Sequence, residues 1–107
     1  MAFTKTVVEQ AFRRQAGLCA HCGKTLVTDR RDRQAWGAWH THHRTPSGGD
    51  SLRNCVILCS ELPQHCHLKV GHGGEPGSHP YLHDCELPYF NAAPSSERPF
   101  PVTEFAY

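Results

Sequence analysis

The feature that most constrains this chain is a pair of cysteines three positions apart, Cys19 and Cys22. A CxxC pair favours a metal over a strained local disulfide, and a tetrahedral zinc ion then needs two further ligands. Cys59 and Cys66 are the best second pair, although the six residues between them exceed the usual spacing. We predict a structural Zn²⁺ ion bound by Cys19, Cys22, Cys59 and Cys66, with a disulfide or free buried thiols as the alternatives.

A metal staple suits a chain of this size. The chain has 107 residues, of which 38% are hydrophobic, so we expect one domain with a thin core. Its six cysteines and nine histidines favour metal binding. Cys55 alternates with Cys59 along a predicted strand and is expected in the core. Cys85 is isolated near the C-terminus and is expected to be a buried thiol.

Hydrophobic patterning predicts an α+β chain. Residues 4–16 have the spacing of a helix, with Thr6 and Glu9 as a capping box and Gly17 as a stop signal. Shorter β-branched and aromatic segments predict strands, and a further helix is expected before the glycine-rich region. These elements are predicted as strands at 25–28, 35–42 and 54–58 and a helix at 60–70.

We expect a single domain over residues 1–107, with an N-terminal helical part at 1–18, a core at 19–70 and an irregular extension at 71–107. Six of the eight prolines lie beyond residue 71, which favours irregular chain there. The extension is expected to pack on the core through Tyr81, Leu82, Tyr89, Phe90 and Phe100.

Charge separates the core from the extension. Residues 1–70 carry ten Lys and Arg against five Asp and Glu, whereas residues 71–107 carry one against five. A basic core is compatible with a polyanionic partner, although an ordinary solvated surface explains the charge alone. The N-terminus lacks the apolar core of a signal peptide, and no segment approaches the roughly 20 apolar residues of a membrane span.

The histidines suggest chemistry. His42 and His43 stand together near the end of a predicted strand, and Asn54 heads the next strand across a Pro-Ser-Gly-Gly turn. One imidazole can bind a divalent metal while the other takes a proton from water. Cleavage of a phosphodiester needs such a base and such a cation. The Asn54 amide can fix the loop that carries the base, and His67 can supply a second metal ligand.

The run HHRTPSGGDSLRNCVILC, followed by Cys66 and His67, resembles the HNH motif of the ββα-metal nucleases. That family has paired metal-ligand and base residues, a Gly-Gly loop, an Asn-led strand ending in Leu-Cys, and Cys-His on a helix. Many members also carry CxxC ahead of the motif. The resemblance covers about residues 17–70 and implies a small zinc-stapled ββα-metal fold, here with an N-terminal helix and an irregular Gly/Pro-rich C-terminal extension.

The resemblance also implies roles for individual residues. His43, three positions before Pro46, takes the place of the general base, and His42 takes that of a metal ligand. Asn54 takes the place of the middle Asn, which orients the base loop. His67 takes the place of the last metal ligand.

Two departures from the family pattern leave the last ligand open. The loop from Pro46 to the two glycines is shorter than usual, and the gap from Cys59 to Cys66 is longer. His65 and His72 therefore compete with His67. His40 shares a strand face with His42 and is either a ligand or a structural histidine. His79 and His83 either support the site or are simply exposed.

The function implied by the resemblance is metal-dependent hydrolysis of DNA with little sequence preference, using Mg²⁺, Mn²⁺, Ni²⁺ or Zn²⁺. Four arginines, Arg30, Arg31, Arg33 and Arg44, flank the expected site and would contact phosphates. Trp36 and Trp39 are expected in the core. RNA cleavage by the same residues is an alternative.

The motif looks like the toxin domains of bacterial competition systems, which are delivered into a target cell and neutralised by a cognate immunity protein. We expect a monomer that acts in the cytoplasm of such a cell and does not bind membranes; a phage or mobile-element nuclease is the alternative setting. A different class of function is a non-catalytic zinc module that binds nucleic acid or protein. A closed second site with four ligands would favour that module, and an open site would favour catalysis.

Overall fold

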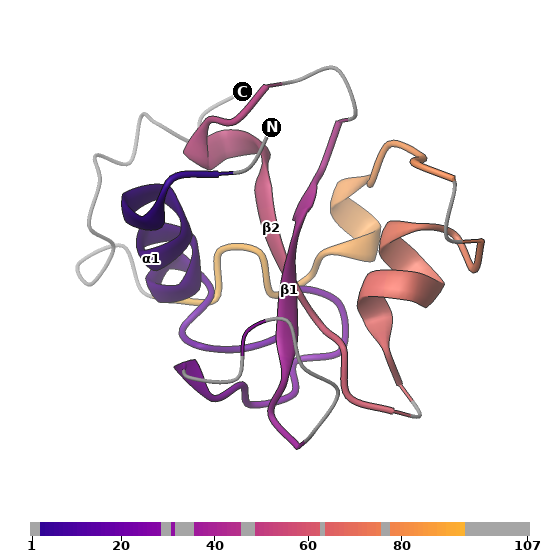
Figure 1. Cartoon of the computed structure of the whole chain (residues 1–107), viewed down its shortest axis with the longest axis horizontal. Coiled ribbons are helices and arrows are strands. Elements are labelled where there is room, and N and C mark those ends of the chain that lie inside the picture. Colours follow the sequence, from indigo (N-terminus) through magenta and orange to yellow (C-terminus); the bar gives the residue numbers. More distant parts are fainter. Residues whose placement is uncertain are drawn as a thin grey trace.

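A computed structural model describes residues 3–28, 31, 36–45, 49–62, 64–75 and 78–93. Helix α1 (Lys5–Arg14) lies on one side of a two-stranded hairpin, and the short helices η3 (His67–Gly71) and η4 (Asp84–Glu86) lie on the other (Figure 1). This is a small α+β fold, as predicted. None of the helices in the described part of the chain is long and apolar enough to cross a membrane.

Helix α1 begins earlier than its predicted cap. The Thr4 hydroxyl accepts a hydrogen bond from the Val7 amide at 3.2 Å, and Thr4 has an extended backbone, as an N-cap residue does. The predicted capping box is therefore wrong, because Thr6 already lies inside the helix. The predicted stop is confirmed: Gly17 has a φ of 70° and turns the chain out of the helix.

Strands β1 (Trp39–His43) and β2 (Cys55–Cys59) form an antiparallel hairpin, in which Trp39 pairs with Cys59 and His43 with Cys55. Alternate side chains of β1 point to opposite faces. On one face Trp39 packs against Phe12 of α1, with ring centroids 5.2 Å apart. The histidines at positions 40 and 42 occupy the opposite face. The strand predicted at 25–28 is wrong, since its only pairing within the described residues is an isolated bridge from Thr25 to Leu18.

The outer edge of β2 is closed by side chains in place of a third strand. The Gln15 amide donates to the Ile57 carbonyl at 2.9 Å and accepts from the Ile57 amide at 3.0 Å. The buried Arg14 guanidinium donates to the Cys55 carbonyl, and the Cys59 amide donates to Cys19 Sγ. These bonds satisfy main-chain groups that would otherwise be buried without partners.

The helix predicted at 60–70 is wrong in length and in type. The helical segment is the π-helix η3 (His67–Gly71), in which the His72 amide donates to the His67 carbonyl at 3.1 Å. His65 has a φ of 38°, a left-handed conformation that interrupts a right-handed helix just before η3. Residues 60–62, 64 and 65 therefore lie outside any helix, where the first half of the predicted helix would have been.

The extension packs on the core through some of its predicted residues. The 3₁₀ helix η2 (Leu52–Asn54) leads into β2, and η4 (Asp84–Glu86) belongs to the extension. Leu82 and Phe90 are buried, as predicted. Tyr81 and Tyr89 are 47% and 39% exposed and cover the core less fully. Phe100 lies outside the described residues.

The predicted burial of the two tryptophans and of two cysteines outside the proposed zinc site is confirmed for one residue of each pair and wrong for the other. Trp39 and Cys55 are buried, and burial raises the pKa of the Cys55 thiol to about 12. Trp36 is 61% exposed, because it precedes β1 and does not share the alternation that buries Trp39. Cys85 is exposed, since its short helix η4 buries none of its own residues.

Candidate functional site

The four predicted cysteine ligands come together. The sulfur atoms of Cys19, Cys22, Cys59 and Cys66 all lie within 4.8 Å of one another, and those of Cys22 and Cys59 are 3.8 Å apart. The Cys66 amide also points at Cys59 Sγ, at 3.5 Å. The long spacer between Cys59 and Cys66 is accommodated by the turn before η3. This cluster could hold a structural zinc ion, for which four thiolates are a common ligand set.

Hydrogen bonds among the four cysteines favour the thiolate form of Cys19, the form that a metal ion binds. The Cys59 and Cys66 thiols donate to Cys19 and hold the pKa of Cys19 well below its usual range. The same bonds to Cys19 raise the pKa of Cys59 to about 12 and raise that of Cys66. Cys19 is therefore the first thiolate of the set, and the remaining thiols would release their protons when a metal binds.

Three histidines form a second cluster on the opposite side of the hairpin from α1. One ring nitrogen from each of His42, His67 and His72 lies within 4.8 Å of the others. His42 and His67 are thus brought together as expected, and His72, left open by the sequence, joins them instead of replacing His67. The ring centroids of His67 and His72 are 4.6 Å apart.

The π-helix explains how these two histidines meet. Residues five apart on an α-helix are rotated by about 140° from each other. The wider π turn closes with a hydrogen bond from residue i+5 to residue i, which returns the chain to the same face. His67 and His72 are the two residues of that bond, so the turn aligns their side chains toward His42.

Hydrogen bonds orient two of these rings for metal binding. His72 Nδ1 donates to the Ser78 carbonyl at 2.8 Å, which leaves Nε2 as the nitrogen with a free lone pair. The His42 ring is hydrogen-bonded to the backbone of Gly71. His42 Nε2 is buried and has no hydrogen-bond partner among the described residues. In a metal-ligating histidine, one ring nitrogen is usually hydrogen-bonded to the protein and the other is left for the metal.

Burial keeps two of these three rings uncharged. Loss of hydration, together with the nearby charges of His72, His79 and His43, lowers the pKa of His42 to about 4. Burial likewise lowers the pKa of His67 to about 3, with His40 as the next contributor. Neutral imidazoles at neutral pH are the form that binds a metal. His42 and His67 thus fit a divalent ion in charge, and all three histidines fit it in position.

Further histidines surround the cluster. The His40 ring stacks on His67 with centroids 4.7 Å apart, and His65 lies 6.3 Å from His67. The exposed His79 ring lies 4.8 Å from that of His72 and 6.0 Å from that of His42. None of these three joins the mutual 4.8 Å set, so the described part of the chain supplies three candidate ligands and no fourth.

His43 points away from the three-histidine cluster. It is the last residue of β1, and its ring stacks on Phe3 with centroids 4.3 Å apart. Its Nε2 atom is 2.7 Å from Asp50 Oδ1. The Asp50 contact was not predicted, because it depends on how the loop after Gly49 folds back on the strand. The candidate site therefore extends around the end of β1 instead of lying on one face.

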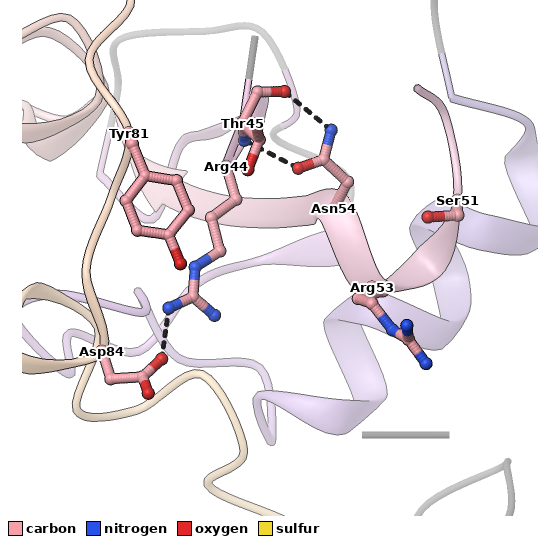
Figure 2. A pocket seen from close by; sticks show the side chains of 7 residues that line it. All are labelled: Arg44, Thr45, Ser51, Arg53, Asn54, Tyr81 and Asp84. Carbon is pink, nitrogen blue, oxygen red and sulfur yellow. Dashed lines mark hydrogen bonds and ion pairs between the residues drawn. The ribbon is translucent and has the colours of Figure 1, made fainter. Parts of the chain in front are cut away.

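Asn54 anchors the loop that follows His43 (Figure 2). Its side-chain oxygen accepts from the Thr45 amide at 2.7 Å, and its Nδ2 group donates to the carbonyls of Thr45 and Gly49. The Asn54 carbonyl also accepts from the Arg44 amide. This is the loop-fixing contact predicted for the Asn54 amide.

The arginines differ in their surroundings. Arg44 is buried, donates from Nε to the Leu82 carbonyl at 2.8 Å, and pairs with Asp84 (Figure 2). Arg31 donates to Thr41 at 3.3 Å. Arg30 and Arg33 lie outside the described residues. A cavity of about 350 Å³ opens beside Arg44; its walls are Arg44, Thr45, Ser51, Arg53, Asn54, Tyr81 and Asp84.

No protein-family model, curated protein or solved structure matches this chain. The functional interpretation accordingly depends on the residues themselves.

Proposed function

We propose that this chain is an HNH-type ββα-metal endonuclease that hydrolyses DNA with little sequence preference. The observation that carries the proposal is the three-histidine cluster, in which His42 Nε2 is buried without a partner among the described residues. An unpartnered buried nitrogen costs stability unless something binds it. A fourth imidazole, that of His43, follows His42 directly in the chain and is partly exposed.

His43 is the base of the proposed reaction. It takes a proton from a water molecule, and the water oxygen forms a bond to the phosphorus of the scissile phosphodiester. The bond from phosphorus to the 3′-oxygen breaks, and that oxygen takes a proton from solvent. The products carry a 5′-phosphate and a 3′-hydroxyl group. The side chain of His43 is 32% exposed, which allows water to approach the ring.

His42, His67 and His72 would hold the catalytic ion. A bound divalent cation (Mg²⁺, Mn²⁺, Ni²⁺ or Zn²⁺) supplies positive charge that stabilises the phosphate and the departing 3′-oxygen. Asn54 supports the reaction by holding the backbone of Thr45 and Gly49, so that the loop after His43 keeps one shape. Three protein ligands with an open side are typical of catalytic sites, whereas closed sets of four are typical of structural ones.

The expected substrate contacts are electrostatic. Arg31, with Arg30 and Arg33 from outside the described residues, would meet backbone phosphates, which position a duplex without reading its sequence. The phosphate contact predicted for Arg44 is not supported, because that side chain is buried and paired with Asp84. The proposed setting is a bacterial antagonistic toxin that acts in the cytoplasm of a target cell as a monomer and is neutralised by an immunity protein. A phage or mobile-element nuclease would use the same chemistry.

The proposal is tested by cleavage of a supercoiled plasmid. The zinc-loaded protein is incubated with each divalent ion in turn, beside an EDTA control and the variant His43→Ala. Because a general base contributes about 10²- to 10⁴-fold, we expect nicking that needs metal and falls by that factor in His43→Ala. His83→Ala, which removes an exposed imidazole from the extension, is the matched control.

Two results would contradict the proposal in different ways. Cleavage that survives His43→Ala would remove His43 as the base and leave the enzyme. Absence of cleavage with every metal, combined with retention of DNA in a gel shift, would favour the non-catalytic zinc module. His79 is the residue that gives this rival some support, because its ring lies beside the cluster as a fourth ligand would.

A further inference from the structure

We propose that Asp50 is a positioning residue that fixes the ring orientation and the tautomer of His43. The inference rests on the proposed function, in which His43 is the base. Asp50 directly follows the two glycines of the loop and reaches back across it to the end of β1. It is neither a metal ligand nor part of the His43–Asn54 arrangement expected from the sequence.

The contact between the two side chains is short and direct. His43 Nε2 and Asp50 Oδ1 are 2.7 Å apart, and both side chains are about two-thirds buried, at 32% and 28% exposed. An ionised carboxylate only accepts hydrogen bonds, so the neutral ring carries its proton on Nε2. The lone pair is then on Nδ1, which is the nitrogen left to take a proton from water.

Phe3 completes the restraint. Its ring stacks on the His43 ring with an angle of 27° between the planes, and Phe3 is 6% exposed. Stacking sets the plane of the imidazole, but a half-turn flip about the Cβ–Cγ bond leaves that plane unchanged. The bond to Asp50 removes that remaining freedom. Two residues distant in sequence thus hold the base in one orientation.

The loop itself is held in place for this task. Asn54 Nδ2 donates to the Gly49 carbonyl at 2.8 Å, one residue before Asp50. Gly49 has a φ of 79°, a left-handed conformation that suits glycine, and this turn directs Asp50 toward the strand. The role of Asn54 is therefore to place Asp50 as well as to fix the loop backbone.

The test combines kinetics with NMR on the metal-loaded protein. The variant Asp50→Asn keeps the shape of the side chain but offers an amide that can donate to the ring, so Nε2–H is no longer selected. We expect kcat for plasmid nicking to fall roughly 10- to 100-fold, the usual effect of removing a group that orients a site histidine, with KM unchanged. Glu9→Gln, which removes one negative charge from an exposed position on α1, is the control and is expected to retain wild-type kcat.

The ¹⁵N spectrum of His43 provides a readout that a merely structural role would not change. Wild-type protein is expected to have its proton on Nε2, and Asp50→Asn is expected to lose that preference while it retains its zinc content. An unchanged tautomer, or a kcat within twofold of wild type, would overturn the inference about Asp50 alone. If wild-type protein cleaves no DNA, the proposed function is wrong, and the catalytic role of Asp50 is wrong with it.

Discussion

At the scale of single residues, burial decides what each histidine does. Period-two alternation along β1 predicts that His40 and His42 share a face, and both rings do contact His67. Alternation cannot predict how deeply each is buried, because that depends on η3, which packs over His42 from later in the chain. Depth of burial is what separates the uncharged candidate ligand His42 from the more exposed rings around it.

The lowered pKa values predict an acid-sensitive fold. The pKa of His42 is about 4 in the folded protein, against about 6.5 for an ordinary histidine, so between these values the unfolded chain binds more protons. Stability is therefore full above pH 6.5 and falls as the pH drops toward 4. The loss from His42 alone is about 3 kcal/mol, taking about 1.4 kcal/mol for each pH unit.

Denaturant unfolding at several pH values measures this effect. His42→Phe retains an aromatic ring without a titrating group, so its stability is expected to fall less steeply between pH 6.5 and 4. The difference between the two proteins isolates His42 from any acid release of zinc by the cysteines. Parallel losses in both proteins would contradict the prediction.

Arg14 and Gln15 illustrate what sequence patterns miss. Both are fully buried, yet they stand at the end of a helix where the apolar spacing gives no reason to place them inside. Arg14 donates to the carbonyls of Leu52 and Phe90, and its guanidinium lies 3.7 Å from the Phe90 ring centre. These partners lie far along the chain, so only the assembled fold shows why the two residues are polar.

At the scale of elements, the sequence predicts the hairpin well and the following helix poorly. β-branched residues and alternation mark the two strands. The long gap from Cys59 to Cys66 left His65, His67 and His72 as candidates for the last ligand. The spacing of five from His67 to His72 fits neither an α-helix nor a strand. The π turn resolves that spacing, and it also brings Gly71 against the His42 ring.

Gly71→Ala tests this packing. A Cβ atom at position 71 would lie 3.1 Å from Leu58 Cδ1 and 3.3 Å from two carbons of the His42 ring. Both neighbours are buried and have little room to move. We expect the ring to shift and divalent metal affinity at the three histidines to fall about tenfold, as for other supports of a ligand histidine.

Calorimetric titration with Ni²⁺ measures the affinity, and the zinc content of the cysteine cluster reports whether the fold is intact. Gly74→Ala is a useful comparison, because the position is glycine in a nearby turn with open space around it, although its φ of 92° adds backbone strain. Equal nickel affinity in wild-type protein and Gly71→Ala would show that the His42 ring tolerates the extra methyl group.

At the scale of the whole molecule, the cysteine cluster joins parts that a thin core holds weakly. Cys19 and Cys22 follow α1, Cys59 ends β2, and Cys66 precedes η3. This grouping could be predicted because CxxC is a local motif with few other uses. The long gap between Cys59 and Cys66 gave no indication of the turn before η3. The four cysteines predicted to lie together were nevertheless the correct ones.

Removal of zinc is expected to unfold the domain. Apparent zinc affinities of about 10–16 kcal/mol match or exceed the total stability of a small domain. Circular dichroism melting in a strong chelator, or of Cys66→Ser, should lose its cooperative transition. His67→Ala, which disrupts only the histidine cluster, should still melt cooperatively. A sharp transition in the chelated wild-type protein would show that the core suffices without metal.

The side chains of Arg14 and Gln15 have one more consequence, for the behaviour of this protein in crowded solution. β2 is a short, apolar strand, and among the described residues no strand neighbours its outer edge. An exposed edge of this kind is a template on which a strand from another molecule can add and start an aggregate. Arg14 and Gln15 stand at the end of α1, so the packed helix holds their side chains against the outer edge of β2. A partly unfolded form in which α1 detaches would expose that edge. We therefore expect docked α1 to limit self-association of the chain.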